Sequence, residues 1–244
     1  NVYLNTGHKD YQYEDLNIIA TKVCTPSNDT RRLTWSECLI KALNKIDSDV
    51  VLYLQDDYFI KAEVKNELVE SYVALMNQEK SIDCIHLTDQ GPDIEHNESK
   101  YEGLFPVRVK QRFRVSCQAA LWRKDVLLSY LESHESAWQF EEYASKRSQY
   151  MGHKFYAVDT NVVKLNEFEI IPYVFTGIFQ GRWMEEVQPL FKENNITIDY
   201  SKRGFFLDAP RRQVSTKIAD FWQRLPAIIK SRLGLFAMKI KYRS

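Results

Sequence analysis

The chain has 244 residues, enough for one large domain or for one domain with a short appendage. Hydrophobic residues make up 44% and charged residues 27%, the balance of a globular protein with a substantial core. No apolar run approaches the length of a membrane span, and the four cysteines form no C-x-x-C pair. The sequence therefore argues against a membrane-spanning protein, a zinc site and a disulfide framework. With no signal peptide visible, we expect a cytoplasmic protein.

The formal net charge is zero, but the two ends of the chain differ in sign. Residues 211–244 contain nine Lys or Arg and one acid, Asp220, whereas residues 1–210 contain 24 basic and 32 acidic residues. An acidic body with a basic tail predicts an anionic surface as the partner of the tail, either a membrane or a nucleic acid.

Strand and helix patterns alternate over residues 1–90. Thr34 and Glu37 form a capping-box signature at the start of a helix. Residues 50–54 are a continuous β-rich run, typical of a strand buried on both faces of a mostly parallel sheet. The other expected strands are residues 2–4, 16–20, 82–87, 105–109, 115–122 and 155–158, and the other expected helices are 64–79, 124–132 and 136–149. The alternation predicts an α/β domain with right-handed crossovers.

Two adjacent carboxylates, Asp56 and Asp57, follow the β-rich run. In open α/β sheets, ligands bind beyond the carboxyl ends of the strands. Neighbouring carboxylates among apolar residues are costly unless a cation offsets their repulsion. Mn²⁺ or Mg²⁺ would do so, and its remaining coordination positions suit diphosphate oxygens. A solvated turn is the alternative, and these residues alone leave both open.

Residues 34–60, which contain the capped helix, the β-rich run and the acid pair, resemble the helix, strand and D-x-D-type motif of GT-A glycosyltransferases. The resemblance is to bacterial enzymes that build surface polysaccharide, such as lipopolysaccharide or capsule. In these enzymes the last acid of the motif usually contacts the metal, which implies that Asp57 is the direct ligand. Asp56 would then bind through water or hold the hydroxyls of the sugar. Gln55 departs from the motif, because it stands where the family has the first acid.

A second block, residues 118–125 followed by 137–142, is similar to the acceptor side of such enzymes. In inverting members, an acid in this block deprotonates the acceptor hydroxyl as that hydroxyl attacks the anomeric carbon. The resemblance implies that Glu141 is this base, with Glu142 as the next choice. It also implies that Gln118 and Trp122 shape the donor or acceptor pocket. The alternative is that both glutamates form an exposed helix face.

Two further cations are candidates for binding the donor diphosphate. Arg32 precedes the capped helix, whose N-terminus favours an anion. Arg182 follows Gly181, and a glycine allows the backbone to approach a phosphate closely. An exposed loop arginine and a tight turn are the respective alternatives.

The basic tail interleaves its cations with large apolar residues, including Phe221 and Trp222. Such a segment suits the interface of an anionic membrane, although we expect Pro226 and Gly234 to break it into pieces. One alternative is a C-terminal helix packed on its own domain with a solvated basic face. Nucleic acid is the least favoured partner, because no recognised nucleic-acid-binding module surrounds the tail.

The resemblance therefore implies a GT-A domain over residues 1–210, with a donor-binding part at about 1–90 and an acceptor part at about 91–210, followed by the tail at 211–244. The implied activity is metal-dependent transfer from a nucleotide sugar, such as a UDP-sugar, to a saccharide or lipid-linked saccharide. The expected place is the inner face of the cytoplasmic membrane. Two alternatives are a non-catalytic saccharide-binding or scaffold protein on the same fold and a metal-dependent nucleotidyltransferase. The latter usually has a basic phosphate loop, which we do not find here.

Overall fold

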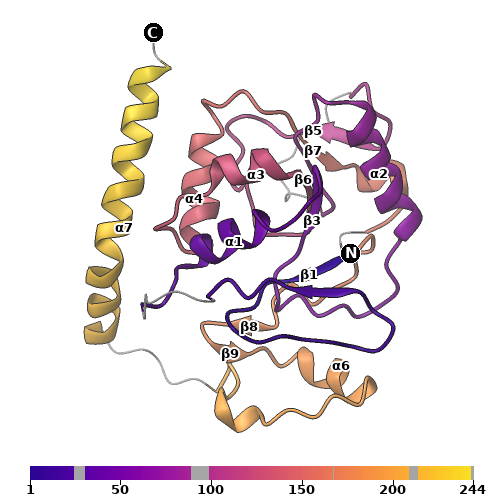
Figure 1. Ribbon diagram of the computed structural model, residues 1–244, viewed down its shortest axis with the longest axis vertical. Coiled ribbons are helices and arrows are strands. Elements are labelled where there is room, and N and C mark those ends of the chain that lie inside the picture. The colour runs from indigo at the N-terminus through magenta and orange to yellow at the C-terminus, as the bar shows by residue number, and fades with distance from the viewer. Residues whose placement is uncertain (25–30, 89–98, 167, 209–213, 243–244) are drawn as a thin grey trace.

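The computed structural model describes residues 1–24, 31–88, 99–166, 168–208 and 214–242, which form a mixed α/β structure (Figure 1). Its centre is a five-stranded sheet in the order β3-β6-β4-β7-β5. These strands are β3 (Val50–Tyr53), β6 (Ala120–Arg123), β4 (Cys84–His86), β7 (Phe155–Val158) and β5 (Leu104–Pro106). Two small sheets pair β1 (Val2–Leu4) with β2 (Ile18–Ala20) and β8 (Ile178–Phe179) with β9 (Arg182–Trp183).

The central sheet is mixed, so the expectation of a mostly parallel sheet is wrong. β4 and β7 pair in parallel, but β6 runs antiparallel between β3 and β4, and β5 runs antiparallel to β7. A continuous apolar run predicts a strand buried on both faces, but β3 is an edge strand and Leu52 is 40% exposed, so that expectation is wrong as well. Such a run carries no information on the direction of the neighbouring strand, and here a strand from later in the chain separates β3 from β4.

Helices cover both faces of this sheet. The described helices are α1 (Trp35–Leu43), α2 (Asn66–Gln78), α3 (Lys124–Tyr130), α4 (Ala137–Arg147), α5 (Thr160–Val163), α6 (Val187–Glu193) and α7 (Val214–Lys241), with a 3₁₀ turn at Tyr200–Lys202. Figure 1 shows α1, α3 and α4 on one side of the sheet and α2 on the other. Adjacent strand residues divide between the two cores: Trp122 packs with the α1, α3 and α4 side, and Leu121 packs with the α2 side. Successive side chains of a strand point to opposite faces, which places one in each core.

The capping box expected at residue 34 is present. Thr34 Oγ1 accepts the backbone N–H of Glu37 at 3.0 Å, and Glu37 Oε2 accepts the backbone N–H of Thr34 at 2.9 Å. A second capping box, between Ser136 and Gln139, starts α4. Both reciprocal pairs satisfy backbone donors that a helix start would otherwise leave without partners.

The strand expected over 115–122 begins only at Ala120. Before it, the backbone N–H groups of Val115, Cys117 and Ala119 donate to the Ser145 Oγ, the Glu141 Oε1 and the Tyr173 hydroxyl. Because side chains already satisfy these donors, the segment needs no ladder partner and forms a buried loop instead of a strand.

The basic tail forms one helix over Val214–Lys241, so the expected breaks at Pro226 and Gly234 are wrong. Gly234 lies at an exposed position, where a helical glycine costs only about 1 kcal/mol relative to alanine. α7 packs against α4, and such tertiary packing stabilises a helix more than the intrinsic preferences of its residues. Within the described part of the chain, no helix is long and apolar enough to cross a membrane.

Candidate functional site

Asp57 lies just beyond the end of β3, and a distant segment holds its carboxylate in place. Oδ2 accepts hydrogen bonds from Thr176 Oγ1 at 2.8 Å and from the backbone N–H of Ile178 at 3.3 Å. Oδ1 is buried and has no hydrogen-bond partner among the described residues. An unsatisfied buried carboxylate oxygen is costly, which makes this atom a candidate contact for a cation or a ligand donor.

Gly177 allows this close approach. Its backbone N–H donates to the carbonyl of Asp57 at 2.9 Å. A Cβ at this position would lie 2.8 Å from the same carbonyl oxygen and would overlap the ring of Phe59. The segment that fixes Asp57 therefore depends on the missing side chain.

The residues present fit a metal that takes only part of its coordination from the protein. Asp57 supplies one orphan oxygen, and the adjacent Asp56 is exposed to solvent. Across the described residues, no group of three His, Cys, Asp or Glu side chains could hold an ion. Mg²⁺ and similar ions are often bound by one or two carboxylates, with waters and substrate phosphates completing the shell.

Glu141 faces inward from α4. Its Oε1 accepts the backbone N–H of Cys117 at 2.8 Å. Burial raises the pKa of the Glu141 carboxyl, and the hydrogen bond from Cys117 opposes this effect. Desolvation destabilises the ionised form, which makes this carboxylate a stronger base than an exposed glutamate.

The structure brings Asp57 and Glu141 into one neighbourhood. Burial is the main cause of the raised pKa of the Tyr58 hydroxyl, and the charges of both carboxylates add to it. The same two charges, after burial, raise the pKa of the Cys117 thiol. We call this group the carboxylate cluster, and its members are Asp57, Tyr58, Cys117, Gln118, Glu141 and Tyr173.

Tyr173 joins the two sides of the carboxylate cluster. Its hydroxyl donates to Gln118 Oε1 at 2.8 Å, and its ring stacks on Tyr58 with centroids 4.6 Å apart. Gln118 therefore belongs to the carboxylate cluster, and its expected role in a ligand pocket stays a prediction. Tyr173 and Thr176 were missed, because each is a single residue in an irregular segment with no local motif.

Glu142 and Trp122 do not join the carboxylate cluster. Glu142 is exposed and pairs with Lys146 at 2.6 Å, one helical turn along the surface of α4. Trp122 is 0% exposed and packs on Phe155 and Tyr130 in the core, so its expected role in a ligand pocket is wrong. A tryptophan near a motif can equally well be a core residue. Trp122 is one because it lies in β6, with its side chain in the core.

An exposed tryptophan lies on α4 instead. Trp138 is 68% exposed, and its ring contacts Phe179 edge-on at a centroid distance of 6.3 Å. It stands three residues before Glu141, a spacing that places both on the same side of the helix. An exposed ring beside a candidate base suits stacking on a sugar. Trp138 lies in the block at residues 137–142 that resembles the acceptor side of glycosyltransferases, but the resemblance gave it no role.

The two candidate arginines are placed differently. Arg182 Nη1 donates to the carbonyl of Arg203 at 3.3 Å, which ties it to its own loop and not to the carboxylate cluster. Arg32 lines a cavity of about 1030 Å³ between α7 and the N-terminal ends of α1 and α4. The cavity is lined by His8, Cys24, Arg31, Arg32, Leu33, Thr34, Trp35, Cys38, His134, Ser136, Gln139, Gln223, Arg224 and Ala227.

This cavity, the arginine cavity, favours an anion. Among the described residues, no Asp or Glu lines this cavity, and no ion pair involves Arg32 or Arg224. Arg31 is engaged with Glu37, and this bond is the main reason why the pKa of the Glu37 carboxyl is lowered to about 2. The capped end of α4, which has no acid in its first turn, adds positive potential at the wall of the cavity.

The arginine cavity and the carboxylate cluster lie on either side of the start of α4. Ser136 and Gln139 line the cavity, whereas Glu141 belongs to the carboxylate cluster. No protein-family model, curated protein or solved structure matches this chain. The functional assignment therefore rests on the chemistry of these two regions.

Proposed function

We propose that the protein is a GT-A-type glycosyltransferase that moves a sugar from a nucleotide-sugar donor to a hydroxyl of a saccharide or lipid-linked saccharide. The observation that carries this proposal is the carboxylate cluster. It contains one carboxylate with an orphan oxygen, Asp57, and one whose pKa is raised by burial, Glu141. Pairs of titratable groups held in different environments are typical of sites that divide binding and proton transfer between them.

Asp57 and Asp56 would hold Mn²⁺ or Mg²⁺ together with the donor diphosphate. The metal, when bound, would neutralise charge on the departing nucleoside diphosphate. The bonds from Thr176 and Ile178 fix Oδ2 of Asp57 and leave Oδ1 for this contact. Because the carboxylate is already oriented, little ordering is needed when the ligand arrives.

Glu141 would accept the proton of the acceptor hydroxyl. The acceptor oxygen then forms a bond to the anomeric carbon, and the bond from that carbon to the diphosphate breaks with its electron pair on the leaving group. The bond from Cys117 orients the carboxylate, and burial keeps water away from it. Attack from the side opposite to the leaving group inverts the anomeric centre.

The arginine cavity supports an anionic donor. Its volume of about 1030 Å³ is at the upper end of the range for small-molecule sites. Arg32 and Arg224 supply cations to this cavity.

A non-catalytic saccharide-binding protein is the second candidate. Gln55 replaces the first acid of the motif, and the described residues offer no group of three metal-ligating side chains. Trp138 would stack on a sugar in either case. The two functions differ in whether the donor is consumed.

The deciding experiment measures release of nucleoside diphosphate from a panel of nucleotide sugars, with Mn²⁺ and saccharide acceptors. We expect release from one donor, and we expect Glu141→Gln to lower turnover by about a hundredfold or more, the usual effect of removing a positioned base. The matched control is Glu142→Gln, which alters the exposed neighbour and is expected to leave turnover unchanged. Saccharide binding without donor consumption would favour the second candidate, and loss of turnover in the control alone would move the base to Glu142.

A further inference from the structure

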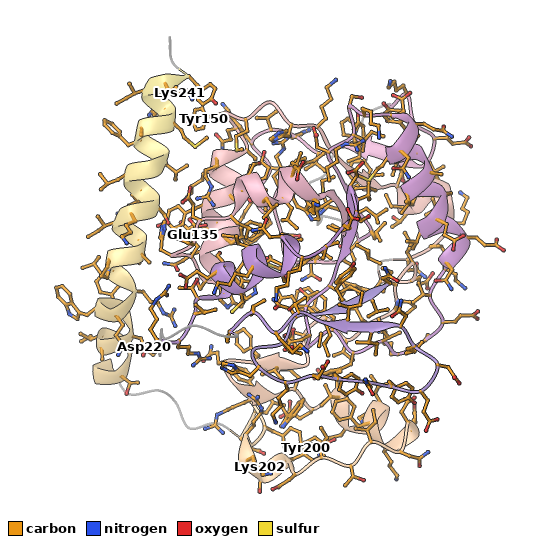
Figure 2. The ribbon with its side chains drawn as sticks, viewed as in Figure 1. Glu135, Tyr150, Tyr200, Lys202, Asp220 and Lys241 are labelled. Carbon is orange, nitrogen blue, oxygen red and sulfur yellow. The ribbon has the colours of Figure 1, made fainter. Side chains whose placement is uncertain are left out.

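The C-terminal helix α7 has two different faces, and its inner face is already used. Ser231 is 2% exposed, and its hydroxyl donates to Glu135 Oε1 at 2.7 Å. Ser231 Oγ also lies 2.9 Å from His134 Nε2. Figure 2 shows Glu135 beside the middle of α7, on the side where the helix meets the rest of the protein.

Glu135 is itself fixed from the other side. Its carboxylate forms a two-point ion pair with Arg147 at 2.8 and 2.7 Å, and both side chains are buried. Near the end of α7, the ring of Tyr242 stacks on Tyr150 at a centroid distance of 6.5 Å. α7 is therefore docked along α4, and only its outer face is open to a partner.

The outer face carries an apolar stripe. At about 100° per residue, its six members lie within about 60° of one another and on the side opposite to Ser231. Each has an exposed fraction between 48% and 63%. The members of this stripe are Ile218, Trp222, Ile229, Leu233, Phe236 and Ile240. Exposed apolar surface of this extent along one helix marks an interaction site.

Cations border the apolar stripe on both sides. On the same helical projection, Lys230 and Lys241 lie along one edge, and Arg232 and Lys239 lie along the other. The acid of this helix, Asp220, lies on the inner side of the projection. The accessible face is therefore apolar along its centre and positive along its edges.

This charge pattern favours an anionic lipid surface over a second copy of α7 as the partner. A second copy of α7 would bring the same cations to the same edges, and like charges at close range repel. An anionic lipid surface offers hydrocarbon for the stripe and negative headgroups for the edges, which the long stems of Lys and Arg can reach. A helix of 28 residues is about 42 Å long, so the stripe can lie along such a surface over its whole length.

We propose that the outer face of α7 lies in the headgroup region of an anionic membrane, with the helix axis parallel to the surface and the body attached through Glu135. This inference does not depend on the proposed sugar transfer. If both hold, the membrane also brings the protein to a lipid-linked acceptor, and α7 connects that surface to the arginine cavity through Arg224.

The test is co-sedimentation of the full chain with vesicles of phosphatidylcholine, with or without phosphatidylglycerol. We expect binding only when phosphatidylglycerol is present, weakened but not abolished by salt. Trp222→Ser with Phe236→Ser should weaken partitioning by about a hundredfold, because two large side chains lose their burial in lipid. Replacing Lys230, Arg232, Lys239 and Lys241 with Gln should weaken it by about a thousandfold.

The matched control is Tyr13→Ser with Leu207→Ser, which removes two large apolar side chains that are also more than 60% exposed, but on the body, and should leave vesicle binding unchanged. Thermal unfolding of each variant checks that it is folded. Equal binding to both vesicle types would overturn the proposal, as would full binding by the charge variant. A wild-type dimer that the Trp222 and Phe236 substitutions convert to a monomer would show that the stripe binds a second copy instead.

Discussion

Arg147→Met breaks the buried ion pair that underlies the attachment of α7. Glu135 is 0% exposed and Arg147 is 4% exposed, and the two nitrogen–oxygen contacts are 2.8 and 2.7 Å. Removing one partner leaves a buried charge uncompensated, which costs about 3–5 kcal/mol. For a protein of this size, that loss corresponds to a fall in Tm of about 6–20 °C.

Thermal unfolding followed by circular dichroism measures this change. Lys146→Met is the matched control, because Lys146 is the preceding residue and its pair with Glu142 is exposed. An exposed pair of this kind contributes only about 0.3–0.5 kcal/mol. Hydrogen exchange at the α7 amides should rise in Arg147→Met and not in the control, because Ser231 loses a fixed partner. Equal Tm values for the two variants would refute the reasoning.

Four other substitutions have signs that follow from the structure. Glu141→Gln should raise or maintain Tm at neutral pH. The folded-state pKa of the Glu141 carboxyl is raised, so the ionised carboxylate lowers stability at pH values above that pKa. When Tm is measured against pH, the advantage of Gln should vanish as the pH falls below the ordinary pKa of glutamate. Asp57→Asn keeps an acceptor for Thr176 but removes the charge, so titration of donor turnover with Mn²⁺ should show that the metal response is lost. The free energy of unfolding should stay within about 1 kcal/mol of wild type. Gly177→Ala should destabilise by about 1–3 kcal/mol in urea unfolding, because its Cβ meets Phe59 and the carbonyl of Asp57. Gly234→Ala, where no atom lies within 4 Å of the added Cβ, should instead stabilise α7 by about 0.5–1 kcal/mol.

Features encoded over a few neighbouring residues could be read from the sequence. The Thr34 and Glu37 capping box is a reciprocal contact across three residues, and it is present at the start of α1. The strand at residues 50–53 and the position of Asp57 beyond it follow from one apolar run ended by two acids. The alternation of helices and strands, and hence the α/β class, is also a local pattern that does not depend on distant partners.

Only the tertiary structure decided which distant residues meet. A pair of adjacent glutamates on a helix does not show which of the two faces inward. In the structure, Glu141 accepts the Cys117 N–H, whereas Glu142 pairs with Lys146 at the surface. The Glu141 contact, with those of Ser145 and Tyr173, delays the start of β6 to Ala120.

The tail shows the same division. Its alternation of cations and large apolar residues was visible in the sequence, but its continuity and its attachment were not. The attachment includes the bond between Ser231 and Glu135, residues that local patterns cannot connect. Periodicity records which faces of an element are apolar, whereas the partner of each face is set by long-range packing that no short window of sequence contains.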